Sequence, residues 1–170
     1  MSDRAGGPSR AAALREAFDA AFAAPAEAPR RDEVSLLALR VGTEPVALRV
    51  LEAAGILAAR PIAHVPSRRP ELLGVAGLRG NVVPVYSVAR LLGRAEEQEA
   101  PRFLVLASTA PEERLALAFS GFDGHLRVRP AALAAAPERA LSHVRELVQL
   151  GAESRPVLSV PSLVRAITGR

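Results

Sequence analysis

The sequence predicts a mainly β fold of short strands, and three observations support this prediction. Apolar runs of about four to eight residues recur between residues 34 and 160, several of them rich in valine. Glycine and proline, present 12 and 14 times, interrupt these runs at turn-like intervals. Hydrophobic residues form 49% of the chain and aromatic residues only 4%, so the core must be aliphatic. About nine strands at this spacing are typical of small barrels or a sandwich.

In the first part of the β region, a glycine-containing turn at residues 42–44 separates two apolar runs, as in a hairpin. We expect Leu51–Leu57 to form a helical turn. Ser87–Leu92 is expected to form a short helix that ends at Gly93. The strands expected in this part are Val34–Val41, Pro45–Val50, Ile62–Val65, and the two runs that flank Gly77–Gly80.

The second part of the β region also consists of short apolar runs separated by turns. Pro130–Glu138 is rich in alanine and is expected to be a loop or a helix. Pro161–Thr168 is expected to be a terminal helix, because proline suits the first turn of a helix. The strands expected here are Phe103–Ala107, Arg114–Phe119, Gly124–Arg129, His143–Leu150 and Arg155–Val160.

Residues 1–33 are rich in alanine, proline and glycine, unlike the rest of the chain. We interpret them as an N-terminal tail before a domain over residues 34–170. Within the tail, Ala11–Ala24 predicts a helix that stops at Pro25. Leu14, Phe18 and Phe22 follow one another at spacings of four and form a narrow apolar stripe. Two interpretations remain open: a frayed tail helix, or a helix that docks this stripe on the body or on a partner.

Charge and composition limit the possible functions. All 22 basic residues are arginine, which raises the pI to about 11.0 although the net charge is only +4. Residues 34–94 carry most of the excess, with eight arginines against three acids. No basic stripe with interleaved aromatic residues is present, so we expect no nucleic-acid partner. The chain has no cysteine, no apolar run long enough to span a bilayer and no secretion signal, so a cytoplasmic protein is expected.

Two arrangements of polar residues were considered as chemical sites. His64, His125 and His143 lack a second ligand at metal-binding spacing, and we expect isolated histidines and no metal site. Ser120, Asp123 and His125 lie close in sequence, but a nucleophilic triad is assembled from separate elements around a strained turn. We therefore expect no enzyme activity and no cofactor.

The most informative segment is Leu72–Val85, in which two apolar runs flank a Gly-Leu-Arg-Gly turn. Gly77 and Gly80 allow a tight turn or a close backbone approach. Arg79 is the one charged residue there, and arginine is common at interface hot spots. The glycines at 74, 77 and 80 do not open a helix, so a dinucleotide-binding motif is not expected.

This segment resembles the Ile-x-Gly-Val-x-Asn-Leu-Arg-Gly-x-Ile-Val-Pro-Val block of the chemotaxis coupling proteins, the CheW family. The resemblance extends from about Val34 to Ile167. Leu36–Gly42 is similar to the family's opening strand and turn, Leu115–Gly121 to its mid-chain strand, and Arg155–Val160 to its final strand.

The resemblance implies two SH3-like five-stranded β-barrels packed together, with short connecting helices and a groove between the barrels. It also implies a non-enzymatic adaptor without a cofactor. The adaptor would couple the cytoplasmic tip of a chemoreceptor, a methyl-accepting chemotaxis protein, to a CheA-type histidine kinase. It would sit in the cytoplasm, peripheral to the membrane and without direct insertion. The residues it places at partner interfaces are Leu78, Arg79, Gly80, Val82, Val83 and Val85.

The chain departs from the family pattern at several polar positions. Ser87 and Ser120 stand where the family usually has aspartate, and Ser159 stands where it has aspartate or asparagine. Gly55 replaces a glutamate and Ala89 an arginine. These losses leave an alternative open, in which a divergent coupler binds the receptor but has lost or weakened kinase binding.

Overall fold

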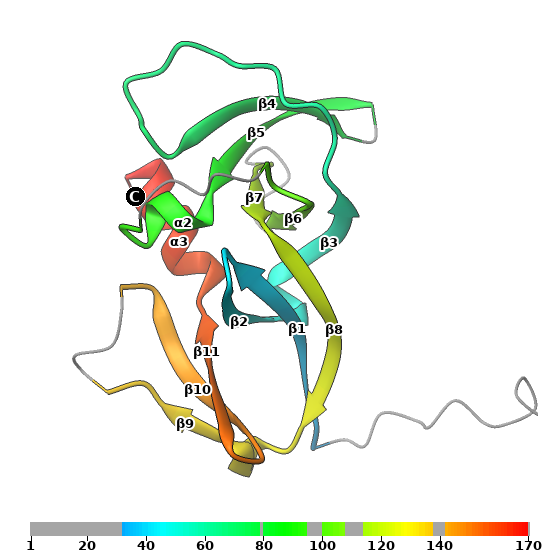
Figure 1. Cartoon of the computed structure of the whole chain (residues 1–170), viewed down its shortest axis with the longest axis vertical. Helices are drawn as coiled ribbons and strands as arrows, with labels where there is room; N and C mark the ends of the chain where they lie inside the picture. The colour runs from blue at the N-terminus through cyan, green and yellow to red at the C-terminus, as the bar shows by residue number, and fades with distance from the viewer. Residues whose placement is uncertain (1–31, 79, 95–99, 108–113, 138–141, 170) are drawn as a thin grey trace, which may run out of the picture. The chain divides into compact units, whose positions relative to one another are not determined.

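The computed structural model describes residues 32–78, 80–94, 100–107, 114–137 and 142–169. These residues form a mainly β fold with short helices (Figure 1). In chain order, the elements are β1 (Val34–Val41), β2 (Glu44–Arg49), the 3₁₀ turn η1 (Val50–Glu52), β3 (Ala53–Ala58), β4 (Leu72–Leu78), β5 (Asn81–Ser87), α2 (Val88–Leu91), β6 (Phe103–Ala107), β7 (Ala116–Phe119), β8 (Gly121–Val128), the 3₁₀ turn η2 (Pro130–Ala132), β9 (Leu133–Ala135), β10 (Val144–Leu150), β11 (Glu153–Leu158) and α3 (Val160–Thr168).

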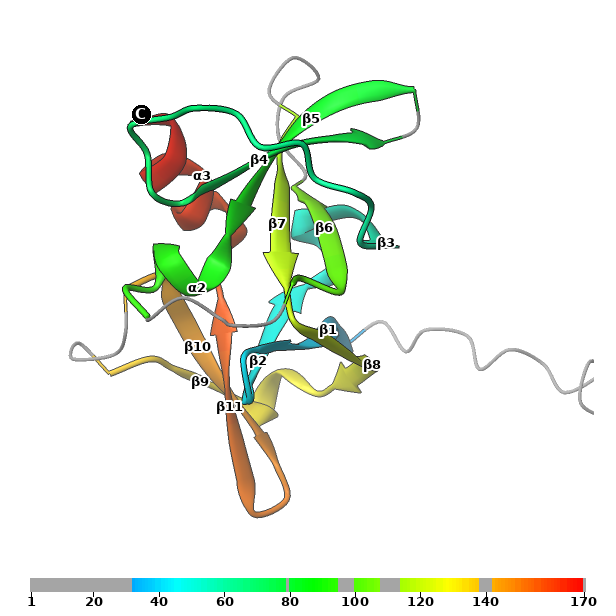
Figure 2. The ribbon, with the colours of Figure 1, turned by 45° about the horizontal axis from the view of Figure 1, so that its top comes forward.

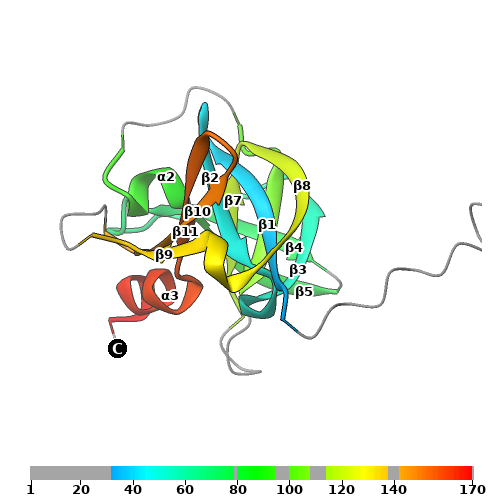
Figure 3. The same ribbon diagram turned by 90° about the horizontal axis from the view of Figure 1, so that it is seen from below.

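The strands form two sheets. One has six strands in the order β8-β1-β2-β11-β10-β9, and the other has five in the order β3-β6-β7-β5-β4. Strands β1 and β2 therefore belong to the same sheet as the last strands of the chain, and they lie between β8 and β11 (Figures 1 and 3). Most neighbours are antiparallel, while β11 runs parallel to β2 and β5 runs parallel to β7.

The alternation of side chains along the inner strands explains how the two sheets pack. In β7 all four residues are buried, because Leu117 and Phe119 face one apolar cluster while Ala116 and Ala118 face another. The first of these clusters takes residues from both sheets and from both helices, and we call it the shared core. Its buried members are Leu37, Leu39, Val41, Val46, Leu48, Val88, Ala89, Val105, Ala107, Leu115, Leu117, Phe119, Leu158, Val160, Leu163, Val164 and Ile167.

Each sheet also has a smaller cluster of its own. Leu36 and Ala47 point away from the shared core and pack with buried valines of β8, β10 and β11. Ala76, Val83 and Val85 pack with residues of β6 and β7 on the face of the five-stranded sheet that points away from the shared core. The residues of β1, β2, β6 and β7 thus alternate between the shared core and one of the two smaller clusters.

The structure confirms the predicted fold class and most of the predicted strands, and it differs at three segments. Of Leu51–Leu57, expected as a helical turn, only the start belongs to η1, because Ala53–Ala58 pairs with β6 as strand β3. The Ala-rich Pro130–Glu138 contains η2 and strand β9, which pairs with β10 and gives one sheet six strands instead of five. Ile62–Val65 makes only an isolated bridge, from Ala63 to Val75.

The tail helix predicted at Ala11–Ala24 lies outside the described residues.

Two glycines of β4 have opposite structural requirements, which gives a matched test of the fold. A Cβ at Gly74 would lie 2.2 Å from the carbonyl oxygen of Ala63, and the φ of Gly74 is +146°. A Cβ at Gly77 would have no atom within 4 Å. We expect Gly74→Ala to lower the free energy of unfolding by about 2–4 kcal/mol. Gly77→Ala should leave it unchanged or raise it by about 0.5 kcal/mol. Urea denaturation of both variants measures this, and equal stabilities would contradict the bridge at Ala63.

Candidate protein-docking site

The β4–β5 hairpin carries the segment that the sequence singled out. Its strands pair from Leu72↔Tyr86 to Leu78↔Asn81, so the turn consists of residues 79 and 80. Gly80 has a φ of +79°, a left-handed conformation that glycine adopts without strain. Arg79, the predicted interface arginine, lies outside the described residues.

The two faces of this hairpin differ in exposure. Leu78, Val83 and Val85 point inward and are buried, so they hold the hairpin on the sheet and have little surface to offer a partner. The outward positions carry Val82 and Gly77, which are cross-strand neighbours. Val82 is 75% exposed, unusual for a valine, and Gly80 is also exposed. Of the described residues predicted to touch a partner, Val82 and Gly80 are therefore the accessible ones.

A pocket of about 230 Å³ lies beside the hairpin. Gly77 and Leu78 of β4 form one wall, and Leu57, Arg60 and Pro61 form the other. Sequence reasoning did not identify Arg60 or Pro61 as site residues, because they are about 17 residues from Gly77 in the chain. The one sequence signal was Gly77 itself, since a glycine inside a strand often marks a close approach by a ligand or another backbone.

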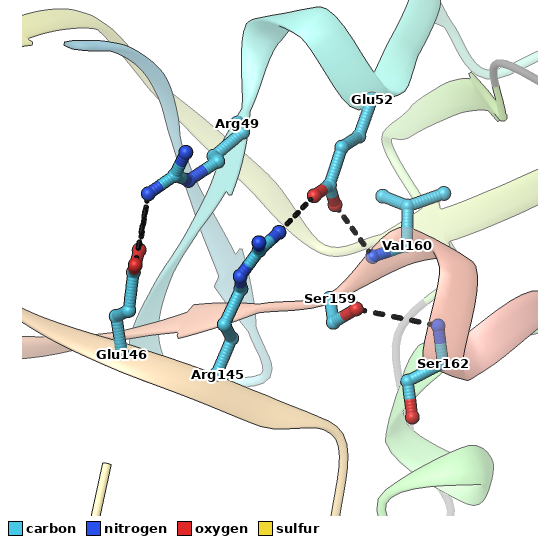
Figure 4. Close-up of polar contacts among 7 residues, drawn as sticks. All are labelled: Arg49, Glu52, Arg145, Glu146, Ser159, Val160 and Ser162. Carbon is cyan, nitrogen blue, oxygen red and sulfur yellow. Dashed lines mark hydrogen bonds and ion pairs between the residues drawn. The ribbon is translucent and has the colours of Figure 1, made fainter. Parts of the chain in front are cut away.

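A second group of polar contacts joins η1 to the C-terminal elements (Figure 4). One carboxylate oxygen of Glu52 accepts a hydrogen bond from the backbone N–H of Val160 at 2.9 Å. The other accepts one from Arg145 at 2.9 Å. Next to them, Arg49 Nη2 donates to both carboxylate oxygens of Glu146 at 2.8 Å. These contacts hold the first turn of α3 against η1, whose Leu51 is 89% exposed.

Two of the departures from the family pattern act as helix caps. Ser159 Oγ accepts a hydrogen bond from the N–H of Ser162 at the start of α3, and Ser87 Oγ accepts one from the N–H of Arg90 at the start of α2. Ala89 is buried in the shared core, where a charged side chain would be costly. These positions therefore have local structural roles in this chain.

The remaining polar candidates do not assemble into a chemical site. Ser120 Oγ lies 2.9 and 3.0 Å from two backbone carbonyl oxygens at the β1–β2 turn, and Asp123 pairs with two arginines. His64 and His125 are exposed. Within the described ranges, no three His, Asp or Glu side chains come together as a metal site would require. In the same ranges, no helix is long and apolar enough to cross a membrane.

The side chain of His143 contacts the start of α3. Its Nδ1 lies 2.8 Å from Ser162 Oγ, and its carbonyl oxygen accepts a hydrogen bond from the N–H of Ser159. Its φ is +71°, a conformation that asparagine adopts more easily than most residues. Burial against the start of α3 lowers the pKa of His143 below its usual value of 6.5.

The contacts of Glu52 predict a measurable contribution to stability. Glu52→Ala leaves the Val160 N–H without its acceptor, and we expect a loss of about 1–2 kcal/mol in the free energy of unfolding. Glu52→Gln keeps an acceptor for Val160 and loses only the ion pair with the half-exposed Arg145, so it should cost about 0.5 kcal/mol. Chemical denaturation at neutral pH compares the two, and an equal loss in both would place the stabilisation in the ion pair.

The lowered pKa of His143 predicts a pH dependence with a defined sign. The unfolded chain binds the proton more readily than the folded chain, so stability rises with pH between the lowered pKa and 6.5. His143→Asn keeps a residue suited to positive φ and removes the titration. Denaturation of both proteins at about pH 5 and about pH 7.5 should show that the wild type loses more stability on acidification. Identical pH profiles would contradict the prediction.

Comparison with known proteins gives two findings. The chain matches the family model described as CheW-like domain over residues 35–168. It resembles the crystal structure of scaffolding protein TtCheW from Thermoanaerobacter tengcongensis, with a TM-score of 0.67 and 11% sequence identity. That match covers 74% of this chain and 88% of that chain, and at this identity it concerns the fold. A search of curated protein sequences finds no match.

The sheets, the hairpin and the family match lead to one assignment. The matched range begins within β1 and ends with the last residue of α3, so it includes both sheets and the shared core. This chain belongs to the family of CheW-like domains, which are non-enzymatic scaffolds of chemotaxis signalling.

Proposed function

We propose that this protein is an adaptor that couples the cytoplasmic tip of a chemoreceptor to a CheA-type histidine kinase. The observation that carries the proposal is the position of the β4–β5 hairpin. Its inward residues are buried, while Val82 and Gly80 are exposed at the segment that resembles the family's signalling block. A side chain as exposed and apolar as Val82 suits contact with another protein.

The shared core between the two sheets supports an adaptor that holds two partners in a defined relative position. The shared core fixes the two sheets to each other, so surfaces on different sheets keep a constant relative position. An apolar stripe of a receptor helix would dock against apolar walls, and the kinase would dock on a separate surface. Binding both partners at once would hold them in one signalling assembly. This function needs no cofactor, and it places the protein in the cytoplasm, at the periphery of membrane-bound receptors.

The alternative is a coupler that binds the receptor but has lost or weakened kinase binding. Its support was the loss of polar side chains relative to the family. Ser87 and Ser159 cap helices and Ala89 is buried, so local structure accounts for these three positions. Ser120 bonds backbone carbonyls of the β1–β2 turn, so it too has a local role. Gly55, at an irregularity in the pairing of β3 with β6, is then the departure that favours the alternative.

Arg79→Ala tests the docking role of the hairpin. We expect the variant to fold normally, because the arginine follows the last residue of β4 at a glycine-containing turn. If Arg79 is an interface hot spot, affinity for the receptor fragment, the kinase fragment or both should fall by roughly five- to a hundred-fold. Arg68→Ala removes the same charge from an exposed position and serves as the control. Unchanged affinity for both partners would refute the role assigned to Arg79.

The same titrations separate the two functions. The purified protein is titrated with the cytoplasmic fragment of a receptor and with the regulatory domain of the kinase, both taken from the genome that encodes this chain. Binding to both supports the coupler. Binding to the receptor, with kinase affinity about tenfold or more below that of an ordinary coupler, supports the alternative. Binding to neither would contradict both.

A further inference from the structure

Strand β4 is an edge strand whose outer side is only partly paired. The order of the five-stranded sheet places β4 next to β5 alone (Figure 2). On its other side, Ala63 and Val75 exchange two backbone hydrogen bonds, of 2.8 and 2.9 Å. The N–H and C=O of Val75 therefore point away from β5. Since backbone directions repeat every second residue, the N–H and C=O of Gly77 point to the same open side.

A proline stops the pairing at this point. If the antiparallel register of Ala63↔Val75 continued, Pro61 would be the partner of Gly77, but no backbone hydrogen bond joins these two described residues and they line a pocket instead. Proline has no N–H to donate, so a further pair of hydrogen bonds cannot form there. In the described part of the chain, the backbone bonds along this edge of β4 end at the Ala63 bridge. Gly77 thus presents a donor and an acceptor that a strand from another chain can use.

The pocket lies at the same place. It is lined by Gly77 and Leu78 on one side and by Leu57, Arg60 and Pro61 on the other, with a volume of about 230 Å³. A Cβ at Gly77 would have no atom within 4 Å, so the space in front of this residue is open. Glycine inside a strand weakens the strand, so an open space in front of it is consistent with a binding role. The volume is sufficient for one apolar side chain.

The positive charge of Arg60 at the pocket indicates the charge of the segment that would bind there. Arg60 is exposed and lines the pocket, and it takes part in none of the ion pairs found among the described residues. Residues 34–94 also carry an excess of five positive charges. An arginine with a free guanidinium group binds a carboxylate in a bidentate manner. The pocket therefore favours an acidic segment over a basic one.

We propose that the open edge of β4 binds an extended, acidic segment of a partner protein by strand addition. The segment pairs with the N–H and C=O of Gly77, places one apolar side chain in the pocket, and sets an Asp or Glu carboxylate against Arg60. This mode differs from the helix docking of the proposed function and does not depend on it. It fits a flexible linker or tail better than a folded domain, because the edge accepts backbone in extended form.

The test begins with a library of displayed seven-residue random peptides selected on the full-length protein. We expect enrichment of sequences with an acidic residue next to an apolar one. A synthetic peptide of the enriched sequence is then titrated against the wild type and three variants. Gly77→Val fills the open space, and Arg60→Glu reverses the charge at the pocket. Arg68→Glu makes the same change of charge at an exposed arginine that does not line the pocket.

We expect Gly77→Val and Arg60→Glu to weaken peptide binding about tenfold or more, and Arg68→Glu to change it by less than about threefold. Melting temperatures of the variants check that each one folds. Amide hydrogen exchange gives an independent readout, since strand addition should slow the exchange of the Gly77 N–H.

Failure to enrich any sequence, equal binding by all variants, or unchanged exchange at Gly77 would overturn the proposal. A Gly77 amide already protected in the free full-length protein would also overturn it, because the edge would then be occupied by the chain itself.

Discussion

The burial of aliphatic side chains between the two sheets is the interaction on which the rest of the structure depends. Strands of both sheets, α2 and α3 all supply side chains to the shared core, and Phe119 is its one buried aromatic residue. Directional bonds at the rim of this core fix neighbouring elements. Glu52 of η1 bonds the start of α3, and Arg49 of β2 bonds Glu146 of β10 within the six-stranded sheet.

The packing of the core determines which parts of the molecule remain available to bind other proteins. Strands β1, β2, β6 and β7 use both faces for packing, so they have little side-chain surface left for binding. Contact with other molecules must come from elements at the margins of the sheets. The β4–β5 hairpin and η1 are such elements, and they carry the two most exposed large apolar side chains, Val82 and Leu51. Both lie beside turns, where a partner can approach without disturbing the core.

The sequence was informative where structure depends on local pattern. The apolar run Val34–Val41, the glycines around residue 79 and the proline at the start of α3 each gave the correct element. The sequence was misleading where pairing with a segment far away in the chain determines the secondary structure. Ala53–Ala58 contains residues that favour a helix, but pairing with β6, about fifty residues away, makes it a strand. The alanines of β9 likewise extend along β10.

For the same reason, the pocket was not predictable, because it forms where Arg60 and Pro61 lie across from Gly77 and Leu78 of β4 in the folded chain. Of the predicted site residues, the pattern indicated correctly which segment forms the hairpin, but not which of its valines are exposed. Val82 and Val83 are adjacent and both apolar, and only the direction of the strand relative to the sheet separates the exposed one from the buried one.

The position of β1 and β2 between β8 and β11 has a consequence for the order of events during synthesis. Strands β1 and β2 leave the ribosome before some of their neighbours, which are made about 90 to 110 residues later, since Leu36 pairs with Leu126 and Ala47 with Val157. The five-stranded sheet, by contrast, is encoded by one continuous stretch from β3 to β7. This sheet can assemble while the chain is still being synthesised. The six-stranded sheet is completed later, when β8 and β11 pair with the β1–β2 hairpin. A topology with such long sequence separations is expected to fold slowly, with the hairpin's apolar side chains exposed until the last strands arrive.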